Sequence, residues 1–251
     1  MDDYRFLNIP DSCFIGSTIY KKLFYENGNL SSGDKALFTD VINKVVWLYC
    51  LKPETINIPV YKDDIREYPE LEVIEVSVTQ DYKLNRIAEI IMKTIPYPMI
   101  LIFKLEDKVR FYVAHQKINQ SDPNRNTIGD FIYTDWLERE SAFFDQLDIK
   151  KMRFTNLYAL YSDFVDAISI YNLSLMIPIH PNITGDEARE LSAKIEEIEQ
   201  RITSLRSKIK KETQFNRKME QNIEIKKLEQ RKNQLLGGEK NERNISYGQN
   251  S

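Results

Sequence analysis

The clearest hydrophobic pattern of the chain lies near its C-terminus, between Asp186 and Leu236. Apolar residues there alternate three and four positions apart, at Ile195, Ile198, Ile202, Leu205 and Ile209. Such a repeat, averaging about 3.5 residues, is typical of a coiled-coil seam that faces a partner helix. No Gly or Pro interrupts the stretch before Gly237. We therefore predict a rod on the order of 75 Å long, at about 1.5 Å per residue, which needs a packing partner outside itself.

The second half of this stretch admits two interpretations. The same register continues through two polar residues, Glu212 and Asn216, to Met219 and Ile223. Polar seam residues weaken a coiled coil but fix its register and partner number. One interpretation is a parallel or antiparallel dimer of long helices, and the other is a break near Thr213 that gives a helical hairpin. The absence of Gly and Pro favours the long helix. We assign partner binding to the five seam residues together with Met219 and Ile223.

The rest of the chain alternates between strand and helix patterns. The run from Val45 to Leu51 is rich in β-branched and aromatic residues and predicts a buried strand. Apolar residues alternate with polar ones from Glu72 to Val78, as in a half-buried strand. A helix over 84–95, an apolar strand over 99–103 and a hairpin partner over 109–114 follow. This order predicts a mixed sheet with a right-handed crossover.

These elements define an α/β fold, a mixed-sheet body flanked by helices and followed by a long coiled-coil helix or helical hairpin. A helix over 156–173 has a wide apolar face that should cover the sheet. Thr184 and Glu187 are spaced as a capping box at the start of the C-terminal stretch. We predict three parts: a globular body over 1–178, a coiled-coil arm over 179–237 and a flexible tail over 238–251.

Composition narrows the function classes. The 251 residues carry a net charge of −3, which argues against a general nucleic-acid coat protein. Two cysteines and two histidines make neither a disulfide framework nor a zinc signature. The eight glycines form no phosphate-binding loop. An acidic N-terminus and short apolar runs predict a cytoplasmic, soluble protein without membrane contact. We expect no metal ion and no cofactor.

A few side chains are weak catalytic candidates. Glu72 and Glu75 lie on one predicted strand, with Glu70 just before it, and would hold Mg²⁺ in a nuclease, active or degenerate, of the PD-(D/E)XK type. His115 comes after an apolar strand, where a base or a phosphate contact is found, and Lys117 is close behind it. Solvated acids and a structural histidine are the interpretation we favour. Magnesium is expected only if the nuclease hypothesis holds.

A basic cluster lies in the middle of the seam region. It comprises Arg201, Arg206, Lys208, Lys210, Lys211, Arg217 and Lys218. Seven such charges along a helix are able to contact nucleic-acid phosphates, which gives the hypothesis of a DNA-binding adaptor. The solvated outer face of a coil is the interpretation that we favour.

Four stretches carry a resemblance that spans nearly the whole chain: Lys44–Asn57, Ile95–Phe103, Val113–Lys117 and Lys211–Met219. On these stretches the chain resembles the bacterial domain of unknown function 4391 family. Members of that family tend to be encoded beside helicases and DNA methyltransferases in restriction-like anti-phage loci. The resemblance implies an accessory subunit of a DNA-targeting defence assembly, and it assigns no catalytic residue.

These observations together favour a non-catalytic accessory or adaptor subunit that assembles through its coiled coil. Its expected partners are helicase or DNA methyltransferase subunits, or a second copy in a homo-oligomer, with DNA as a further contact. The metal-dependent nuclease and the DNA-binding adaptor are the alternatives.

Overall fold

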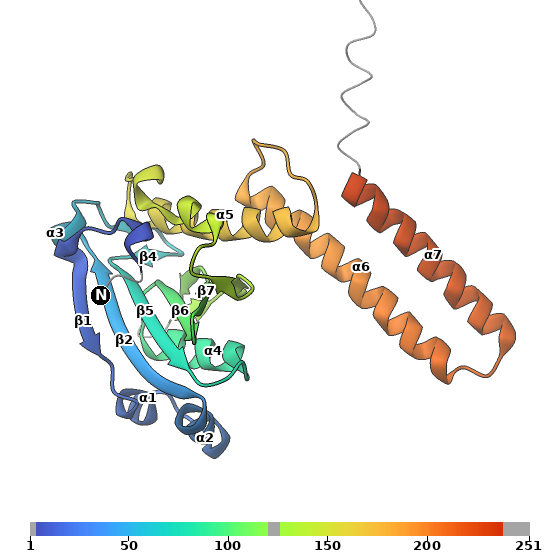
Figure 1. Ribbon diagram of the computed structural model, residues 1–251, viewed down its shortest axis with the longest axis horizontal. Helices are drawn as coiled ribbons and strands as arrows, with labels where there is room; N and C mark the ends of the chain where they lie inside the picture. The colour runs from blue at the N-terminus through green and yellow to red at the C-terminus, as the bar shows by residue number, and fades with distance from the viewer. Residues whose placement is uncertain (1–3, 120–125, 238–251) are drawn as a thin grey trace, which may run out of the picture. The chain divides into compact units, whose positions relative to one another are not determined.

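The computed structural model describes residues 4–119 and 126–237, and the chain divides into two compact units, residues 1–168 and 169–251 (Figure 1). The division falls earlier than the predicted boundary at residue 178. Leu173 and Ile177 form one apolar cluster with Ala188 and Ile195, which belong to the next helix along the chain. The predicted flexible tail over 238–251 lies outside the described residues.

The first unit is built on a mixed sheet that has seven strands in the described residues. Six follow one another as β1 (Phe14–Thr18), β2 (Ile42–Leu51), β5 (Leu71–Val78), β6 (Met99–Leu105), β7 (Lys108–Val113) and β10 (Ile132–Tyr133), and β11 (Leu137–Glu138) also pairs with β7. Strands β5 and β6 are parallel, and the other pairs are antiparallel. The helix α4 (Leu84–Thr94) connects the parallel pair. The predicted mixed sheet is therefore confirmed.

Two short strand pairs lie beside this sheet. One joins β3 (Tyr61–Lys62) to β4 (Glu67–Tyr68), and the other joins β8 (Gln116–Ile118) to β9 (Asn126–Ile128). Short helical turns complete the unit, as α3 (Pro53–Ile56), η1 (Arg5–Leu7), η2 (Asp11–Cys13), η3 (Ala142–Leu147) and η4 (Ile149–Lys151).

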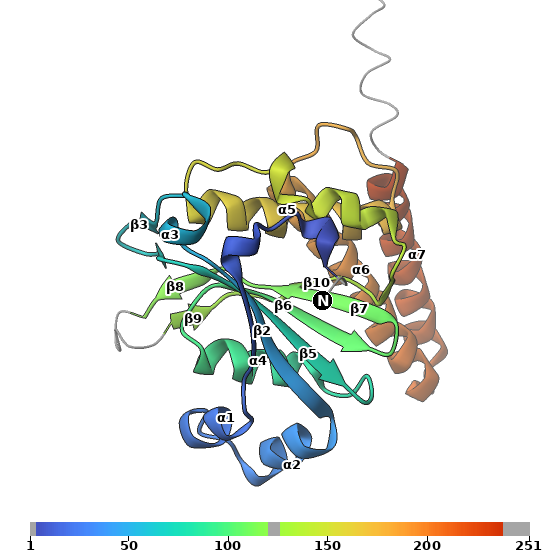
Figure 2. The same cartoon turned by 60° about the vertical axis from the view of Figure 1, so that its left-hand side comes forward.

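Helices cover both faces of the sheet, because both faces are apolar. Figure 2 shows α4 on one face and the start of α5 (Leu157–Met176) on the other. With α1 (Lys22–Asn27) and α2 (Ser32–Asp40), α4 encloses the core of its side. That core includes Ile74, Val76, Leu101, Phe103, Ile87 and Ile91. Each such side chain contributes about 1.5–3 kcal/mol when it leaves water.

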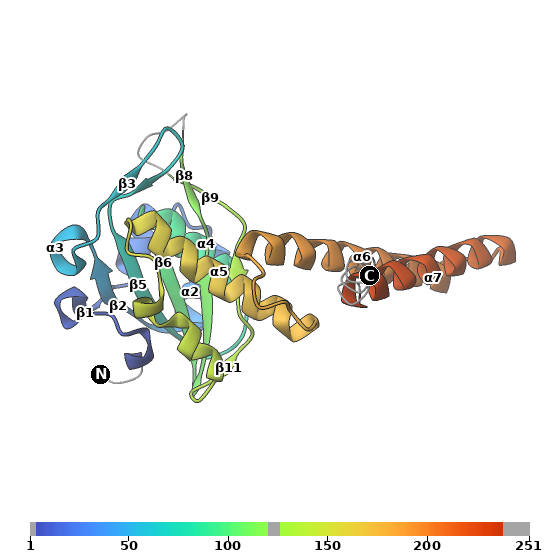
Figure 3. The same ribbon diagram turned by 90° about the horizontal axis from the view of Figure 1, so that it is seen from above.

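The second unit contains a helical hairpin of α6 (Gly185–Lys211) and α7 (Phe215–Gly237), which lie side by side (Figure 3). The preference for one continuous helix was wrong, and the hairpin alternative is the correct one. The break needs neither Gly nor Pro, because the Glu212 carboxylate accepts hydrogen bonds from the backbone N–H groups of Thr213 (2.8 Å) and Gln214 (2.9 Å). The predicted capping box of Thr184 and Glu187 at the start of α6 is confirmed.

The hairpin buries most of the predicted seam within the chain. Ile198, Ile202 and Leu205 of α6 form an apolar cluster with Ile225 of α7. Three partly buried residues, Ile209, Leu228 and Leu235, pack against this cluster. We expected the helix to need a packing partner outside itself, and in the structure α7 of the same chain covers the seam of α6.

Within the described residues, no helix combines the length and the apolar character that a membrane crossing requires.

Candidate functional site

The pairing of β2 with β5 brings three potential metal-binding side chains together. Cys50 lies directly opposite Glu72 in the antiparallel register. Glu70 comes two residues before Glu72, so both side chains project from the same side of the chain. One potential ligand atom from each of the three residues lies within 4.8 Å of the others. We refer to Cys50, Glu70 and Glu72 as the Cys–Glu cluster.

Burial dominates the electrostatics of the Cys–Glu cluster. Glu72 is only 2% exposed, and burial raises the pKa of its carboxyl to about 7, with the charge of Glu70 acting in the same direction. The indole N–H of Trp47 donates a hydrogen bond to the Glu72 carboxylate and partly offsets this effect on its pKa. Burial, together with the nearby Glu72 and Glu70 charges, raises the pKa of the Cys50 thiol to about 12, and the charge of Lys52 acts in the opposite direction.

The Cys–Glu cluster offers a metal ion one thiol sulfur and two carboxylate groups, and this donor set suits some metal ions better than others. The thiol of Cys50 donates to Oε2 of Glu70 across 3.7 Å. Sulfur and carboxylate oxygen are both ligands of zinc-like divalent ions. Among the described residues, the Cys–Glu cluster is the group of at least three His, Cys, Asp or Glu side chains that lie close enough together to hold one ion.

The predicted pair of Glu72 and Glu75 is not brought together. Residues three apart on a strand point to opposite faces of a sheet, which separates these two carboxylates. On its own face, Glu75 accepts hydrogen bonds from the Tyr4 hydroxyl (2.7 Å) and the Ser77 hydroxyl (3.2 Å). The predicted set of three acids is therefore divided: Glu70 lies beside Glu72, and Glu75 lies apart from both.

The other two catalytic candidates lie in a different part of the sheet unit. Nδ1 of His115 is 2.9 Å from the hydroxyl of Tyr68, and its ring also contacts Tyr158 and Tyr161. Lys117 is exposed on β8. This environment of aromatic rings is that of a packed histidine, in agreement with the structural interpretation.

A different feature occupies the second unit, on the side of α7 that faces away from α6. Phe215, Met219 and Ile223 are 73%, 47% and 53% exposed. Residues four apart lie on one face of a helix, so the three side chains form a continuous apolar stripe. Ile225 and Leu228, which point toward α6, lie on the opposite face of the same helix. We call the three exposed residues the α7 stripe.

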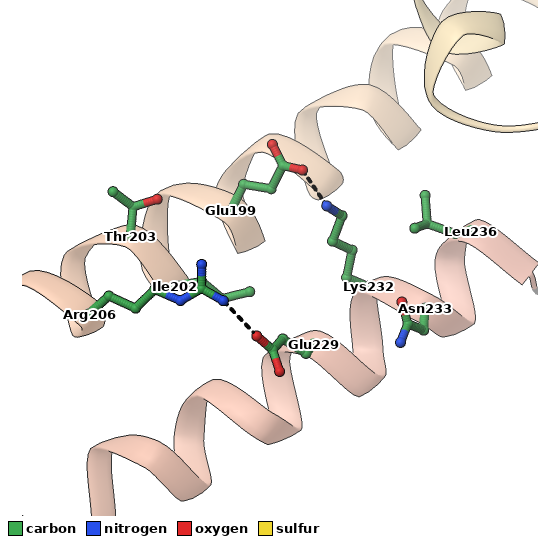
Figure 4. Close-up of a pocket in the computed structure, with 8 residues that line it drawn as sticks. All are labelled: Glu199, Ile202, Thr203, Arg206, Glu229, Lys232, Asn233 and Leu236. Carbon is green, nitrogen blue, oxygen red and sulfur yellow. Dashed lines mark hydrogen bonds and ion pairs between the residues drawn. The ribbon is translucent and has the colours of Figure 1, made fainter. Parts of the chain in front are cut away.

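The predicted basic cluster is partly used within the hairpin. Arg201 pairs with Glu224 and Arg206 with Glu229, each at 2.8 Å. Lys232 pairs with Glu199 in the same way, and Figure 4 shows this pair and that of Arg206 joining the two helices. Such exposed pairs contribute about 0–1 kcal/mol each. The remaining basic residues lie around the loop end, where α6 finishes and α7 begins: Lys208, Lys210, Lys211, Arg217 and Lys218.

Of the predicted partner-binding residues, the structure leaves only Met219 and Ile223 widely exposed. Two important residues were missed. Phe215 continues their four-residue spacing toward the N-terminus, and this spacing was the signal that would have found it. Cys50 gave no such signal, because its place beside Glu72 depends on the register between β2 and β5.

The comparisons with known proteins identify a family and no activity. The family model described as domain of unknown function, DUF4391, matches residues 7–231. The chain therefore belongs to this family, and the resemblance is confirmed. No curated protein and no solved structure matches the chain.

Proposed function

We propose that this member of the DUF4391 family is a non-catalytic accessory subunit that docks a partner protein through the α7 stripe. The observation that carries the proposal is the alignment of three widely exposed apolar side chains, Phe215, Met219 and Ile223, on one helix face. Single exposed apolar residues are ordinary, whereas a contiguous set is typical of an interaction surface.

The geometry of the stripe fits a known mode of recognition. Helices that bind in a groove present apolar anchors on successive turns, and the spacing of Phe215, Met219 and Ile223 follows this rule. Full burial of a wholly exposed side chain of this size contributes about 1.5–3 kcal/mol, and each anchor contributes less than that because it is already partly covered. Since the opposite face of α7 is held by α6, the helix is already formed before it meets the partner. The entropy cost of ordering it is therefore avoided on binding.

The surrounding charges define the partner surface. Lys226 and Lys227 are exposed on α7 just beyond Ile223, and Arg217 and Lys218 lie between Phe215 and Met219 in the sequence. The last turn of α6 adds Lys208, Lys210 and Lys211. Complementary charge sets the register and the rate of association. We therefore expect an apolar groove in the partner, bordered by Asp and Glu side chains. A second copy of this chain would place like charges together, which argues against self-pairing at the stripe.

The identity of the partner is proposed from the family resemblance. A helicase or a DNA methyltransferase subunit of a DNA-targeting anti-phage assembly in the bacterial cytoplasm is the expected partner. In this proposal the chain supplies a preformed docking helix, and the partner supplies the chemistry on DNA.

The test begins with purification of the tagged full-length protein from its native host and identification of the subunit that accompanies it. Affinity is then measured between the two purified proteins. Phe215→Glu with Met219→Glu should weaken the complex at least about tenfold, or about 1.4 kcal/mol. The matched control, Gln230→Glu with Gln234→Glu, adds the same charge to exposed positions further along α7. It should bind within about twofold of the wild type. Equal affinity of both double variants would overturn the proposal.

The same purified proteins also test the alternative of a DNA-binding adaptor. Five basic residues lie at the loop end of the hairpin, where Arg217 pairs with Glu212 at 3.9 Å, and they would be the phosphate contacts in that case. A gel shift that weakens steeply with salt and is lost in Lys210→Glu with Lys211→Glu, but not in the stripe variant, would favour DNA as the ligand. With such a result, DNA would replace the partner protein as the proposed ligand.

A further inference from the structure

We infer that the Cys–Glu cluster binds one divalent cation of the zinc class, through Sγ of Cys50 and carboxylate oxygens of Glu70 and Glu72. The site lies in the sheet unit, and the inference does not depend on the docking role proposed for α7.

The first argument is the geometry of the donors. All three ligand atoms lie within 4.8 Å of one another, and the sulfur of Cys50 is 3.7 Å from Oε2 of Glu70. In a tetrahedral zinc site, bond lengths of about 2.3 Å to sulfur and about 2.0 Å to oxygen separate two ligands by about 3.5 Å. The observed separation therefore needs little adjustment to accept an ion.

The second argument is an unbalanced buried carboxyl. Asp34 and Glu72 are the two acidic residues among the buried side chains of the described residues. Asp34 accepts two hydrogen bonds from Arg86, each at 2.9 Å, so its charge is balanced. No lysine or arginine in the described residues forms an ion pair with Glu72, which has a second carboxylate and a thiol beside it instead. Buried acids are normally paired with a cation or bound to a metal.

The third argument is the support around the ligands. The Trp47 indole, from the same strand as Cys50, donates to Oε2 of Glu72 and fixes the orientation of that carboxylate. Metal-binding carboxylates are commonly held by a hydrogen bond from a neighbouring side chain in this way. The donor set joins two strands and the residue that leads into β5. A bound ion would therefore act as a cross-link at this end of the β2–β5 pair.

The proton balance of binding follows from the ligands. The Cys50 thiol loses its proton to solvent as the metal–sulfur bond forms, and any proton held by the two carboxyl groups is released as the metal–oxygen bonds form. Three ligand charges then surround the cation in place of a protonated cluster. Affinity should rise with pH over the range in which these protons leave.

The experiment uses the purified full-length protein after removal of bound metal with a chelator. Zn²⁺ is titrated calorimetrically, and Co²⁺ is added separately to detect the sulfur-to-cobalt charge-transfer absorption. We expect one ion per chain, a higher thermal midpoint with Zn²⁺, and the charge-transfer band. Cys50→Ser should remove the band, and Glu72→Gln should weaken Zn²⁺ binding at least about tenfold.

Two matched controls separate a built site from general metal affinity. Cys13→Ser changes the other buried, free cysteine. Glu75→Gln changes the acid on the opposite face of β5. Both should bind as the wild type does. If Cys50→Ser or Glu72→Gln fails to fold, Glu70→Gln serves instead, because Glu70 is only half-buried. The absence of saturable Zn²⁺ binding, or equal binding by all variants, would overturn the inference and leave a cluster that only shares a proton.

Discussion

The sheet unit and the helical hairpin depart from the usual arrangement of polar and apolar residues in opposite ways. The sheet unit buries Glu72, a carboxylic acid, to 2% exposure, and no lysine or arginine of residues 4–119 and 126–237 forms an ion pair with it. The hairpin exposes Phe215 to 73%, although its inner seam is well covered. Buried polar groups and exposed apolar groups are the informative exceptions in a folded protein. Each unit therefore has one candidate site, of a different chemical kind.

The hairpin also separates stability from partner binding, two roles that the sequence pattern assigned to the same residues. The seam of α6 and the stripe of α7 belong to one hydrophobic pattern along the chain. In the structure the seam stabilises the hairpin, while Met219 and Ile223 stand on the outer face. Stability and partner binding should thus respond to different substitutions within the same helices.

The largest effect should come from shortening a seam residue. Ile202→Ala leaves a cavity between α6 and α7, and we expect it to destabilise the hairpin by about 2–5 kcal/mol. Met219→Ala, the matched control on the stripe, should change stability by no more than about 0.5 kcal/mol. Amide hydrogen exchange of α6 and α7 measures both. Slow exchange that persists in Ile202→Ala would mean that the seam does not hold the hairpin together.

The next effect concerns the buried carboxyl in metal-free protein. The pKa of Glu72 is raised to about 7 from an ordinary value of 4.5. A raised pKa gives stability that is fully present below pH ~4.5 and is lost as the pH rises through ~7. At about 1.4 kcal/mol for each pKa unit, the loss is on the order of 3 kcal/mol. Glu72→Gln should remove this loss in chemical denaturation across that range. Parallel pH curves for the two proteins would contradict the expected role of burial.

A smaller pH dependence of stability, with the opposite sign, is expected from Asp34, whose charge is balanced by Arg86. Hydrogen bonds from Arg86 and from Ser31 hold the pKa of Asp34 well below its usual range. A lowered pKa gives stability that is present above the unfolded value of about 3.9 and is lost as the pH falls toward the folded value. Asp34→Asn should cost about 1–3 kcal/mol at neutral pH, because Arg86 is partly exposed and solvent screens the pair. Its acid denaturation curve should be flatter than that of the wild type.

The smallest effect should come from the loop of the hairpin. Glu212→Ala removes the acceptor for two backbone N–H groups, but these groups are close to solvent, which replaces the lost bonds. We expect a slight fall in the thermal midpoint and no change in oligomeric state on a sizing column. Conversion to a dimer would show that Glu212 selects the hairpin over a continuous helix.

Local patterns gave much of the fold. The alternation before Val78, the helix over 84–95 and the apolar run from Met99 together implied the parallel pair β5 and β6. These are short-range signals of period and propensity. The break in the seam region was missed because no Gly or Pro marks it and because Glu212, which accepts two backbone N–H groups there, is a good helix former elsewhere.

The candidate sites were harder to predict from the sequence than the fold. Glu70 and Glu72 share a side of the chain because they are two residues apart, and this spacing was visible. Cys50 joins them only through the register of an antiparallel pair, which no local pattern fixes. The stripe was hidden inside the seam pattern, because the side of α7 that α6 covers depends on where the chain turns.

Site-specific cross-linking in the purified complex most directly tests the role of α7. A photoreactive amino acid at position 219 should join the chain to its partner, at a peptide rich in apolar and acidic residues. The same amino acid at position 231, which is exposed on another side of the same helix, should give little or no product. Equal products from both positions, or none from position 219 in a complex that still forms, would contradict docking through the α7 stripe.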